Sequence, residues 1–360
     1  MMKKITEIDK NFAASSVCGK EMKLYDAEKE PFKIYGVYKP DKKRGFVRMD
    51  PVVANAVNDG VGSLNYHTAG GRVRFKTNSR HIAVKCSFAD CWIMPHMPAS
   101  GSAGFDMYSC GKYLGSFIPP NTCTASEIPD NIKSGYEAAV DLKDEKMRDI
   151  IINFPLYNDV LKLYIGIDEN AVLEEGDKYP NEKPIVFYGS SITQGGCASR
   201  PGNSYQSILS RRLNFDFLNL GFSGSARAEE AMSDYIAGLE MSAFVYDYDH
   251  NAPSAEHLKN THYKMYKKIR AAHPDIPIIT APAPSPCFED ARERAEIIRQ
   301  TSERAKSEGD NNIYFIDGIF KSHDSEMMTV DGCHPNDFGM YCMAEAFEKV
   351  LKEVMTNENK

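Results

Sequence analysis

The stretch IVFYGSSITQGG at residues 185–196 is an apolar run that passes directly into a loop rich in glycine and serine. Short apolar runs of the same kind recur at 215–220, 243–246, 277–280 and 313–316, and segments of helical periodicity lie between or after them. Short strands that alternate with helices form parallel sheets whose two faces are both covered. We therefore predict an α/β domain whose active site lies beyond the carboxyl ends of its strands.

The half of the chain before this stretch has a different periodicity. Residues 72–77 and 81–88 alternate apolar and polar side chains, which indicates strands with one face in solvent. Turn residues separate these and several further extended segments, and no long helical pattern interrupts them. Many short strands of this kind predict an all-β sandwich of jelly-roll type.

A charged segment with two prolines, residues 174–184, separates the two halves. We expect a β-sandwich domain at 1–175, a linker at 176–183 and the α/β domain at 184–360. Two domains also fit the length of 360 residues, because a single domain commonly holds roughly 100–200 residues.

The charge balance limits the classes of partner. The chain has 43 lysines and arginines against 50 aspartates and glutamates, which gives a net charge of −7. Nucleic acids and anionic membranes favour a basic face, so we expect neither of them as a partner. No apolar run approaches the roughly 18–20 residues that a transmembrane helix needs.

The cysteines and the N-terminus bear on the cellular compartment. The nine cysteines form no CxxC pair, and the first lysines are not followed by the apolar stretch of a signal peptide. We expect reduced thiols in a cytoplasmic protein, or a secreted protein if a leader has been trimmed from the sequence.

Residues suited to acyl transfer follow the predicted strands. Serine is a weak nucleophile that needs a base in hydrogen-bond contact, usually a histidine held in the right tautomer by a carboxylate. Ser191 lies at a strand-to-helix turn, His334 lies in the loop before the last helix, and Asp331 precedes it by three residues. We therefore predict Ser191 as nucleophile, His334 as base and Asp331 as the carboxylate that orients it.

An oxyanion intermediate needs hydrogen-bond donors, and the same loops supply them. We expect the backbone N–H groups of Ser191 and Gly224 and the side-chain amide of Asn251 to form the oxyanion hole. Each motif alone has an ordinary alternative: a tight turn for the glycines and Asn251, and a helix cap for Asp331 and His334. Their joint order at successive strand ends favours catalysis.

That combination resembles the SGNH (GDSL-type) hydrolase superfamily. Its nucleophile block matches residues 188–193, its Asn-x-Gly-x-Ser-Gly block matches 219–224, and its Asp-x-x-His-Pro block matches 331–335, with Asn251 as the block III asparagine. The resemblance covers roughly residues 183–355 and implies a flavodoxin-like sheet of five parallel strands. Ser190 stands where the family motif has aspartate.

The first half resembles a domain that precedes some SGNH esterases. Residues 104–108, Gly-Phe-Asp-Met-Tyr, are similar to the Gly-x-Asp-Leu-Tyr signature of that N-terminal β-sandwich. The order of domains also resembles that of family 2 carbohydrate esterases and of bacterial acyltransferases. This resemblance implies a short acyl group, such as acetyl, on a carbohydrate.

Some further residues are weaker candidates. Trp92 and Met94, in a proline-broken loop, and Arg200, after the nucleophile loop, are candidates for contact with the substrate, although packing or surface roles explain them as well. The histidines show no ligand spacing typical of a metal site, so we expect no metal ion and no cofactor. A cysteine nucleophile, Cys333 or Cys197, is a less favoured alternative.

The sequence thus predicts a serine esterase that hydrolyses short-chain acyl esters, acetyl esters above all, of a small molecule or an oligosaccharide. An acyltransferase would use the same triad and pass the acyl group to another alcohol. A carbohydrate-binding protein with an inactive site is a further alternative, but the complete set of Ser191, Gly224, Asn251, Asp331 and His334 disfavours it.

Overall fold

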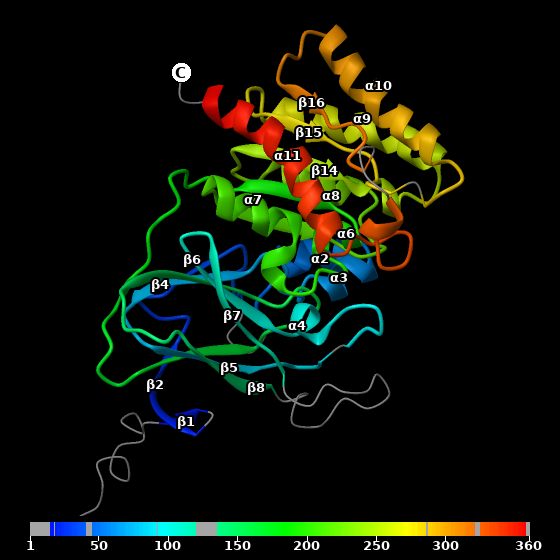
Figure 1. The fold of residues 1–360 in the computed structure, drawn as a ribbon. Helices are drawn as coiled ribbons and strands as arrows, with labels where there is room; N and C mark the ends of the chain where they lie inside the picture. Colours follow the sequence, from blue (N-terminus) through cyan, green and yellow to red (C-terminus); the bar gives the residue numbers. More distant parts are fainter. Residues whose placement is uncertain are drawn as a thin grey trace, which may run out of the picture.

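The computed structural model describes residues 15–17, 19–40, 45–91, 93–119, 135–285, 287–320 and 325–357. They form an antiparallel β-sandwich, made by the first half of the chain, and a parallel α/β unit, made by the second half (Figure 1). The predicted fold class is therefore confirmed. No described helix has both the length and the apolar character that a membrane-spanning segment requires.

Two antiparallel sheets make up the sandwich. One sheet has the order β1 (Ser15–Val17), β2 (Lys20–Asp26), β10 (Lys162–Ile167), β5 (His81–Ser87), β8 (Tyr136–Asp141). The other has the order β11 (Leu173–Glu175), β4 (Arg72–Thr77), β9 (Arg148–Asn153), β6 (Phe105–Ser109), β7 (Lys112–Phe117), and β3 (Lys33–Tyr35) pairs with β4. Alternate side chains of these strands, such as Val73 and Phe75 of β4 and Ile82 and Val84 of β5, fill a shared apolar core.

The α/β unit contains a five-stranded sheet in which every neighbouring pair is parallel. Its order is β13 (Phe217–Gly221), β12 (Ile185–Gly189), β14 (Ala243–Asp247), β15 (Ile278–Thr280), β16 (Ile313–Phe315). This order is that of the flavodoxin-like fold, with β12 in the middle of the first three strands. The ends of these three strands lie level, because Gly189 pairs in register with Gly221 and with Asp247.

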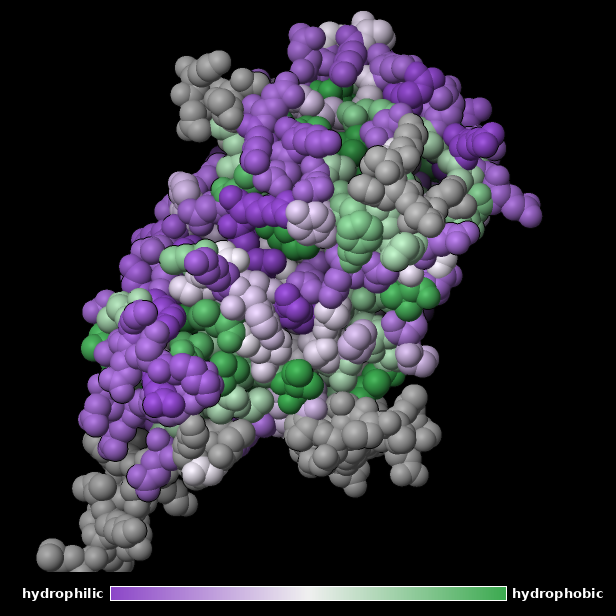
Figure 2. Space-filling model, viewed as in Figure 1, coloured by the Kyte–Doolittle hydropathy of each residue, from purple (hydrophilic) through white to green (hydrophobic). Residues whose placement is uncertain are grey.

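Helices cover both faces of this sheet. Ile185 and Phe187 of β12 face one apolar core, and Val186 and Tyr188 face another, as the two-residue period of a strand requires. The first core includes α7 (Tyr205–Leu213) and α11 (Asp337–Asn357), and the second includes α8 (Glu230–Ala237), α9 (Ala255–Ala272) and α10 (Ala291–Ser307). Figure 2 shows that the outer surface around α10 is hydrophilic.

The first half of the chain also contributes helices to the α/β unit. The helices α2 (Pro51–Val57) and α3 (Asp59–Leu64) place Ala54 and Val61 in the core beneath α8, together with Tyr188. The sequence pattern did not predict this contribution. The remaining short helices lie at loops: α4 (Ala99–Ser102), α6 (Ser191–Gln194), η2 (Pro201–Asn203), η3 (Tyr248–Asn251) and η4 (Ser325–Met328).

The Gly-x-Asp-Leu-Tyr-like segment forms β6 and meets the α/β unit directly. The buried carboxylate of Asp106 accepts the backbone N–H of Gly202 at 2.8 Å and the side-chain amide of Asn153 at 2.8 Å. A Cβ atom at position 202 would lie 2.4–2.6 Å from Tyr108 and Asp106, so only glycine allows this approach. The signature aspartate therefore joins the sandwich to the loop that follows the predicted nucleophile.

Candidate active site

Ser191 stands where β12 passes into the short helix α6. The hydroxyl of Ser190 accepts the backbone N–H of Ile192 at 3.1 Å and so caps this helix. Capping by a side-chain oxygen is also what an aspartate at this position would provide, so the departure from the family motif keeps the same local structure. The turn leaves Ser191 as the first helical residue at the carboxyl edge of the sheet.

A chain of hydrogen bonds connects the three predicted triad residues. The Oγ of Ser191 lies 2.9 Å from Nε2 of His334, and Nδ1 of His334 lies 2.8 Å from Oδ2 of Asp331. The orange segment before α11 carries His334 to α6 (Figure 1). The structure thus brings together side chains that are 143 residues apart in the sequence.

Asp331 also shapes the loop that carries the base. Its Oδ1 accepts the backbone N–H groups of Cys333 at 3.0 Å and of His334 at 2.7 Å. Partial burial acts to raise the pKa of Asp331, but hydrogen bonds from the backbone and ring of His334 outweigh it and lower this pKa to about 2. The carboxylate is therefore ionised at neutral pH and can accept an N–H from Nδ1 of His334, the arrangement in which Nε2 can accept the serine proton.

Two of the three predicted oxyanion donors, Gly224 and Asn251, lie in the loops after β13 and β14. Gly224 has a φ of +67°, and a Cβ atom there would meet nothing within 4 Å. The side-chain amide of Asn251 donates one hydrogen bond to the carbonyl oxygen of Phe222 at 2.8 Å, which ties the two loops together. A primary amide has a second N–H group, which is available to a ligand. The roles of Ser191, Gly224 and Asn251 in an oxyanion hole remain predictions.

Residues from the sandwich side support the nucleophile loop, and the sequence analysis missed them. The buried Tyr157 donates a hydrogen bond from its hydroxyl to the carbonyl oxygen of Ser191 at 3.2 Å. Gln194 of α6 donates to the carbonyl oxygen of Leu156 at 3.2 Å and accepts the backbone N–H of Ser223 at 3.0 Å. These contacts join the segment before β10, the nucleophile loop and the loop that contains Gly224.

A buried arginine holds the strand that leads into the Gly224 loop. The guanidinium of Arg48 donates to the carbonyl oxygens of Asn219, at 3.2 Å, and of Gly221, and it stacks on the ring of Phe222. Complete burial lowers the pKa of Arg48 to about 9. No sequence motif around position 48 indicated this role.

His96 approaches the predicted base from the loop between β5 and α4. Its ring centroid lies 5.8 Å from that of His334, and its side chain is exposed. The ligand atoms of His96, Cys197 and His334 all lie within 4.8 Å of one another. The sandwich therefore contributes a polar side chain to the edge of the site, in the same proline-broken loop that contains Trp92.

The three substrate-contact predictions have different placements. Trp92 lies outside the described residues. Met94 is partly buried and packs against the core on the α7 and α11 side. Arg200 donates from Nε to the hydroxyl of Tyr108 at 3.1 Å and lies over the ring of Tyr113, in the contact between the two halves. Contact of these residues with a substrate remains a prediction.

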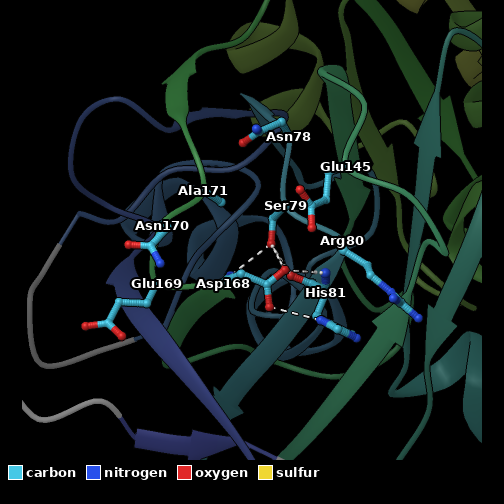
Figure 3. Close-up of a pocket in the computed structure, with 9 residues that line it drawn as sticks. All are labelled: Asn78, Ser79, Arg80, His81, Glu145, Asp168, Glu169, Asn170 and Ala171. Atoms are coloured by element: carbon cyan, nitrogen blue, oxygen red, sulfur yellow. Dashed lines mark hydrogen bonds and ion pairs between the residues drawn. The ribbon is translucent and has the colours of Figure 1, made fainter.

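A second group of serine, histidine and aspartate lies on the sandwich, beside a cavity of about 340 Å³ (Figure 3). There Oδ2 of Asp168 accepts the hydroxyl of Ser79 and the backbone N–H of His81, each at 2.9 Å, while Oδ1 lies 2.9 Å from Nδ1 of His81. The serine hydroxyl faces Asp168 and a backbone carbonyl rather than the imidazole. This arrangement joins two loops and lacks the nucleophile–base contact of a triad.

Comparison with known proteins finds a family model for each half of the chain. Residues 182–352 match the model of the GDSL-like lipase/acylhydrolase family, and residues 22–173 match the GxDLY model, described as the N-terminus of an SGNH hydrolase-type esterase. A comparison with curated proteins finds no significant match.

Among solved structures, a protein from Bacteroides ovatus named as a GDSL-like lipase has 26% identity and a TM-score of 0.80, with 93% of this chain and 98% of that chain covered. The salicylyl-acyltransferase SsfX3 of a tetracycline biosynthetic pathway has 18% identity and a TM-score of 0.74, with 94% and 98% covered. A family two carbohydrate esterase from Clostridium thermocellum has 15% identity and a TM-score of 0.61, with 90% and 98% covered.

The two family models together span both halves of the chain. Residues 182–352 therefore belong to the GDSL-like lipase/acylhydrolase family, and residues 22–173 form the GxDLY-type N-terminal domain that accompanies SGNH hydrolase-type esterases.

Proposed function

We propose that the protein is a serine esterase that removes short acyl groups, acetyl above all, from a carbohydrate. The observation that carries this proposal is the continuous hydrogen-bonded chain from Ser191 through His334 to Asp331. A serine, an imidazole and a carboxylate at these distances form the arrangement that activates a hydroxyl for attack on an ester.

The chemistry follows from the positions of these groups. His334 accepts the proton of Ser191 at Nε2 as Oγ attacks the ester carbonyl, and Asp331 stabilises the imidazolium that forms. The N–H groups of Ser191 and Gly224 and the amide of Asn251 donate to the oxyanion. His334 then protonates the leaving alcohol, and water, activated by the same imidazole, releases the acid from the acyl-enzyme.

Exposure of the triad supports hydrolysis of esters with a bulky alcohol. The side chains of His334 and Asp331 are 24% and 37% exposed, so water and a large leaving group can both reach the base. His96 adds a hydrogen-bonding side chain at the same edge. The shared order of a β-sandwich and an SGNH domain with the family two carbohydrate esterase supports a carbohydrate as the alcohol.

The test is release of acid from a panel of acetylated oligosaccharides and an aryl acetate. Ser191→Ala should lose several orders of magnitude in kcat, because the covalent route is removed. Ser190→Ala is the matched control. It deletes the neighbouring hydroxyl, which caps α6, so it should cost about 1 kcal/mol of stability and leave most of the activity.

Three outcomes separate the alternatives. Release of acid by the wild type and by Ser190→Ala, but not by Ser191→Ala, supports the proposal. Activity of Ser191→Ala above about a tenth of the wild-type value refutes the assignment of the nucleophile. Labelling of Ser191 by a serine-directed phosphonate without release of acid, but with transfer to an added alcohol, identifies an acyltransferase. The absence of both labelling and release leaves a binding protein.

A further inference from the structure

A second cluster of reactive side chains includes Cys333, the residue directly before His334 of the predicted triad. The Sγ atoms of Cys287 and Cys333 are 3.3 Å apart. Nδ1 of His250 lies 3.7 Å from the first sulfur and 3.6 Å from the second. Two sulfurs and one imidazole nitrogen therefore form a nearly equilateral triangle.

The dimensions of this triangle are those of one face of a tetrahedral metal site. Zinc holds thiolate sulfur at about 2.3 Å and imidazole nitrogen at about 2.0–2.1 Å, so tetrahedral angles separate two sulfurs by about 3.8 Å and sulfur from nitrogen by about 3.6 Å. An ion at these bond lengths would sit about 1 Å above the plane of the three atoms. Small movements of the two cysteines would complete the geometry.

Nδ1 is the ring nitrogen of His250 that faces the two sulfurs. The other ring nitrogen, Nε2, is buried and has no hydrogen-bond partner among the described residues. Oδ1 of the adjacent Asp249 is a buried acceptor that also lacks a partner. Cys287 is exposed at the surface, which leaves the outer side of the triangle open to solvent.

We propose that His250, Cys287 and Cys333 bind a thiophilic divalent cation of the zinc class, with a fourth position open to water. Two thiols and an imidazole are the ligand types that select such an ion over magnesium or calcium. Binding forms two metal–sulfur bonds and one metal–nitrogen bond and releases the two thiol protons to solvent.

The three ligands come from three separate segments: η3 after β14, the segment before α10 and the segment before α11. His250 directly precedes Asn251, and Cys333 directly precedes His334. On the proposed function, the ion would therefore fix the backbone of an oxyanion donor to that of the base. Its role is positional, because the ligands are not the triad residues themselves.

A disulfide between the two cysteines accounts less well than a metal site for the positions of the two sulfurs and the imidazole. A disulfide bond is about 2.05 Å long, so the sulfurs are more than 1 Å too far apart for one. A disulfide also needs no imidazole equally distant from both sulfurs.

The experiment uses the full chain, freed of metal by a chelator under reducing conditions and titrated with cobalt(II) and then zinc(II). We expect one cobalt(II) ion per chain, with a thiolate-to-cobalt charge-transfer band and the intense d–d bands of a tetrahedral site. Zinc(II) should displace the cobalt(II) ion and abolish both the charge-transfer band and the d–d bands. Cys287→Ser and Cys333→Ser should each lose the charge-transfer intensity of one thiolate and weaken zinc binding by more than the roughly 10–100-fold that loss of an outer partner costs. Cys110→Ser, an exposed cysteine of the β6–β7 turn, is the matched control and should bind as the wild type does.

Thermal unfolding with and without zinc(II) distinguishes a misfolded variant from one that has lost a ligand. The proposal is overturned by a wild type that shows no charge-transfer band while its thiols are free. It is equally overturned by charge-transfer bands of undiminished intensity in both cysteine variants, or by a Cys287–Cys333 disulfide in protein that was never exposed to oxidant. None of these readouts depends on esterase activity, so a failure here leaves the proposed function standing, and the reverse also holds.

Discussion

Replacement of Asp331 by asparagine separates the chemical role of this carboxylate from its structural role. Oδ1 of Asp331 accepts two backbone N–H groups, and Oδ2 accepts from the ring of His334. In Asp331→Asn the amide oxygen can keep the two backbone hydrogen bonds, and the amide nitrogen then faces Nδ1. Since that nitrogen is a donor, Nδ1 must become the acceptor and Nε2 must carry the proton. The imidazole can then no longer accept the proton of Ser191.

The size of the effect follows from this change of tautomer. The same exchange in a Ser-His-Asp triad lowers kcat by about 10⁴-fold. The side chain of Asp331 is 37% exposed, so water can replace part of its contact with His334. We therefore expect a loss of about 10³–10⁴ in kcat, which corresponds to about 4–5.5 kcal/mol of transition-state stabilisation.

The assay is kcat for the best acetyl ester, measured beside urea unfolding of each variant. Asp331→Asn should unfold within about 1 kcal/mol of the wild type, whereas Asp331→Ala should also lose the two loop hydrogen bonds, at about 0.5–1.5 kcal/mol each. If Asp331→Asn folds normally and keeps more than about a tenth of the wild-type kcat, the assignment of the orienting carboxylate is wrong.

Three further changes test other parts of the structure. Asn251→Ala should lower kcat by about 10²–10³ with little change in KM, because an oxyanion donor acts mainly in the transition state, and an unchanged kcat would remove Asn251 from the oxyanion hole. Tyr157→Phe should lower the free energy of unfolding by about 0.5–1.5 kcal/mol in urea, through loss of its hydrogen bond to Ser191, and equal stability would contradict that contact. Burial raises the pKa of Asp247 from 3.8 to about 6, so the unfolded chain loses this proton first and wild-type stability falls as the pH rises through that window, by up to about 3 kcal/mol. The free energy of unfolding of Asp247→Asn should not fall in this way between about pH 4 and about pH 8. If the wild type and Asp247→Asn depend on pH in the same way, the raised pKa of Asp247 is refuted.

The sequence predicted the fold class because both halves have simple hydrophobic periods. The strands at 243–247 and 278–280 are close to the apolar runs expected from the sequence, since each is buried on both faces of the sheet. Helices α2 and α3 could not be predicted as part of the α/β unit. The apolar residues of these helices, such as Ala54 and Val61, predict that the helices are buried. They do not indicate whether the helices pack in the core of the sandwich or in that of the α/β unit.

Some residues of the candidate site could likewise be predicted from the sequence, and others could not. Ser191, Asp331 and His334 could be found because each lies in a short motif at a strand end, and the parallel sheet brings such ends together. Tyr157 and His96 carry no motif of their own, and only the packing of the two halves brings them to Ser191 and His334. The cysteine–histidine cluster was missed for a related reason, because its ligands have no common spacing.

The contacts of the nucleophile loop show that the sandwich is part of the active-site structure rather than an attached module. Asp106 binds the backbone at Gly202, after the nucleophile turn, and Tyr157 binds the carbonyl oxygen of Ser191 within that turn. Both contacts are buried, where an unpaired partner costs about 1–3 kcal/mol, so each side depends on the other for its hydrogen bonds. The exposed ring of His96, from the sandwich, lies 5.8 Å from the ring of His334. On the proposed function, the alcohol part of the ester would therefore lie between the two halves, while the α/β unit alone would supply the reacting groups.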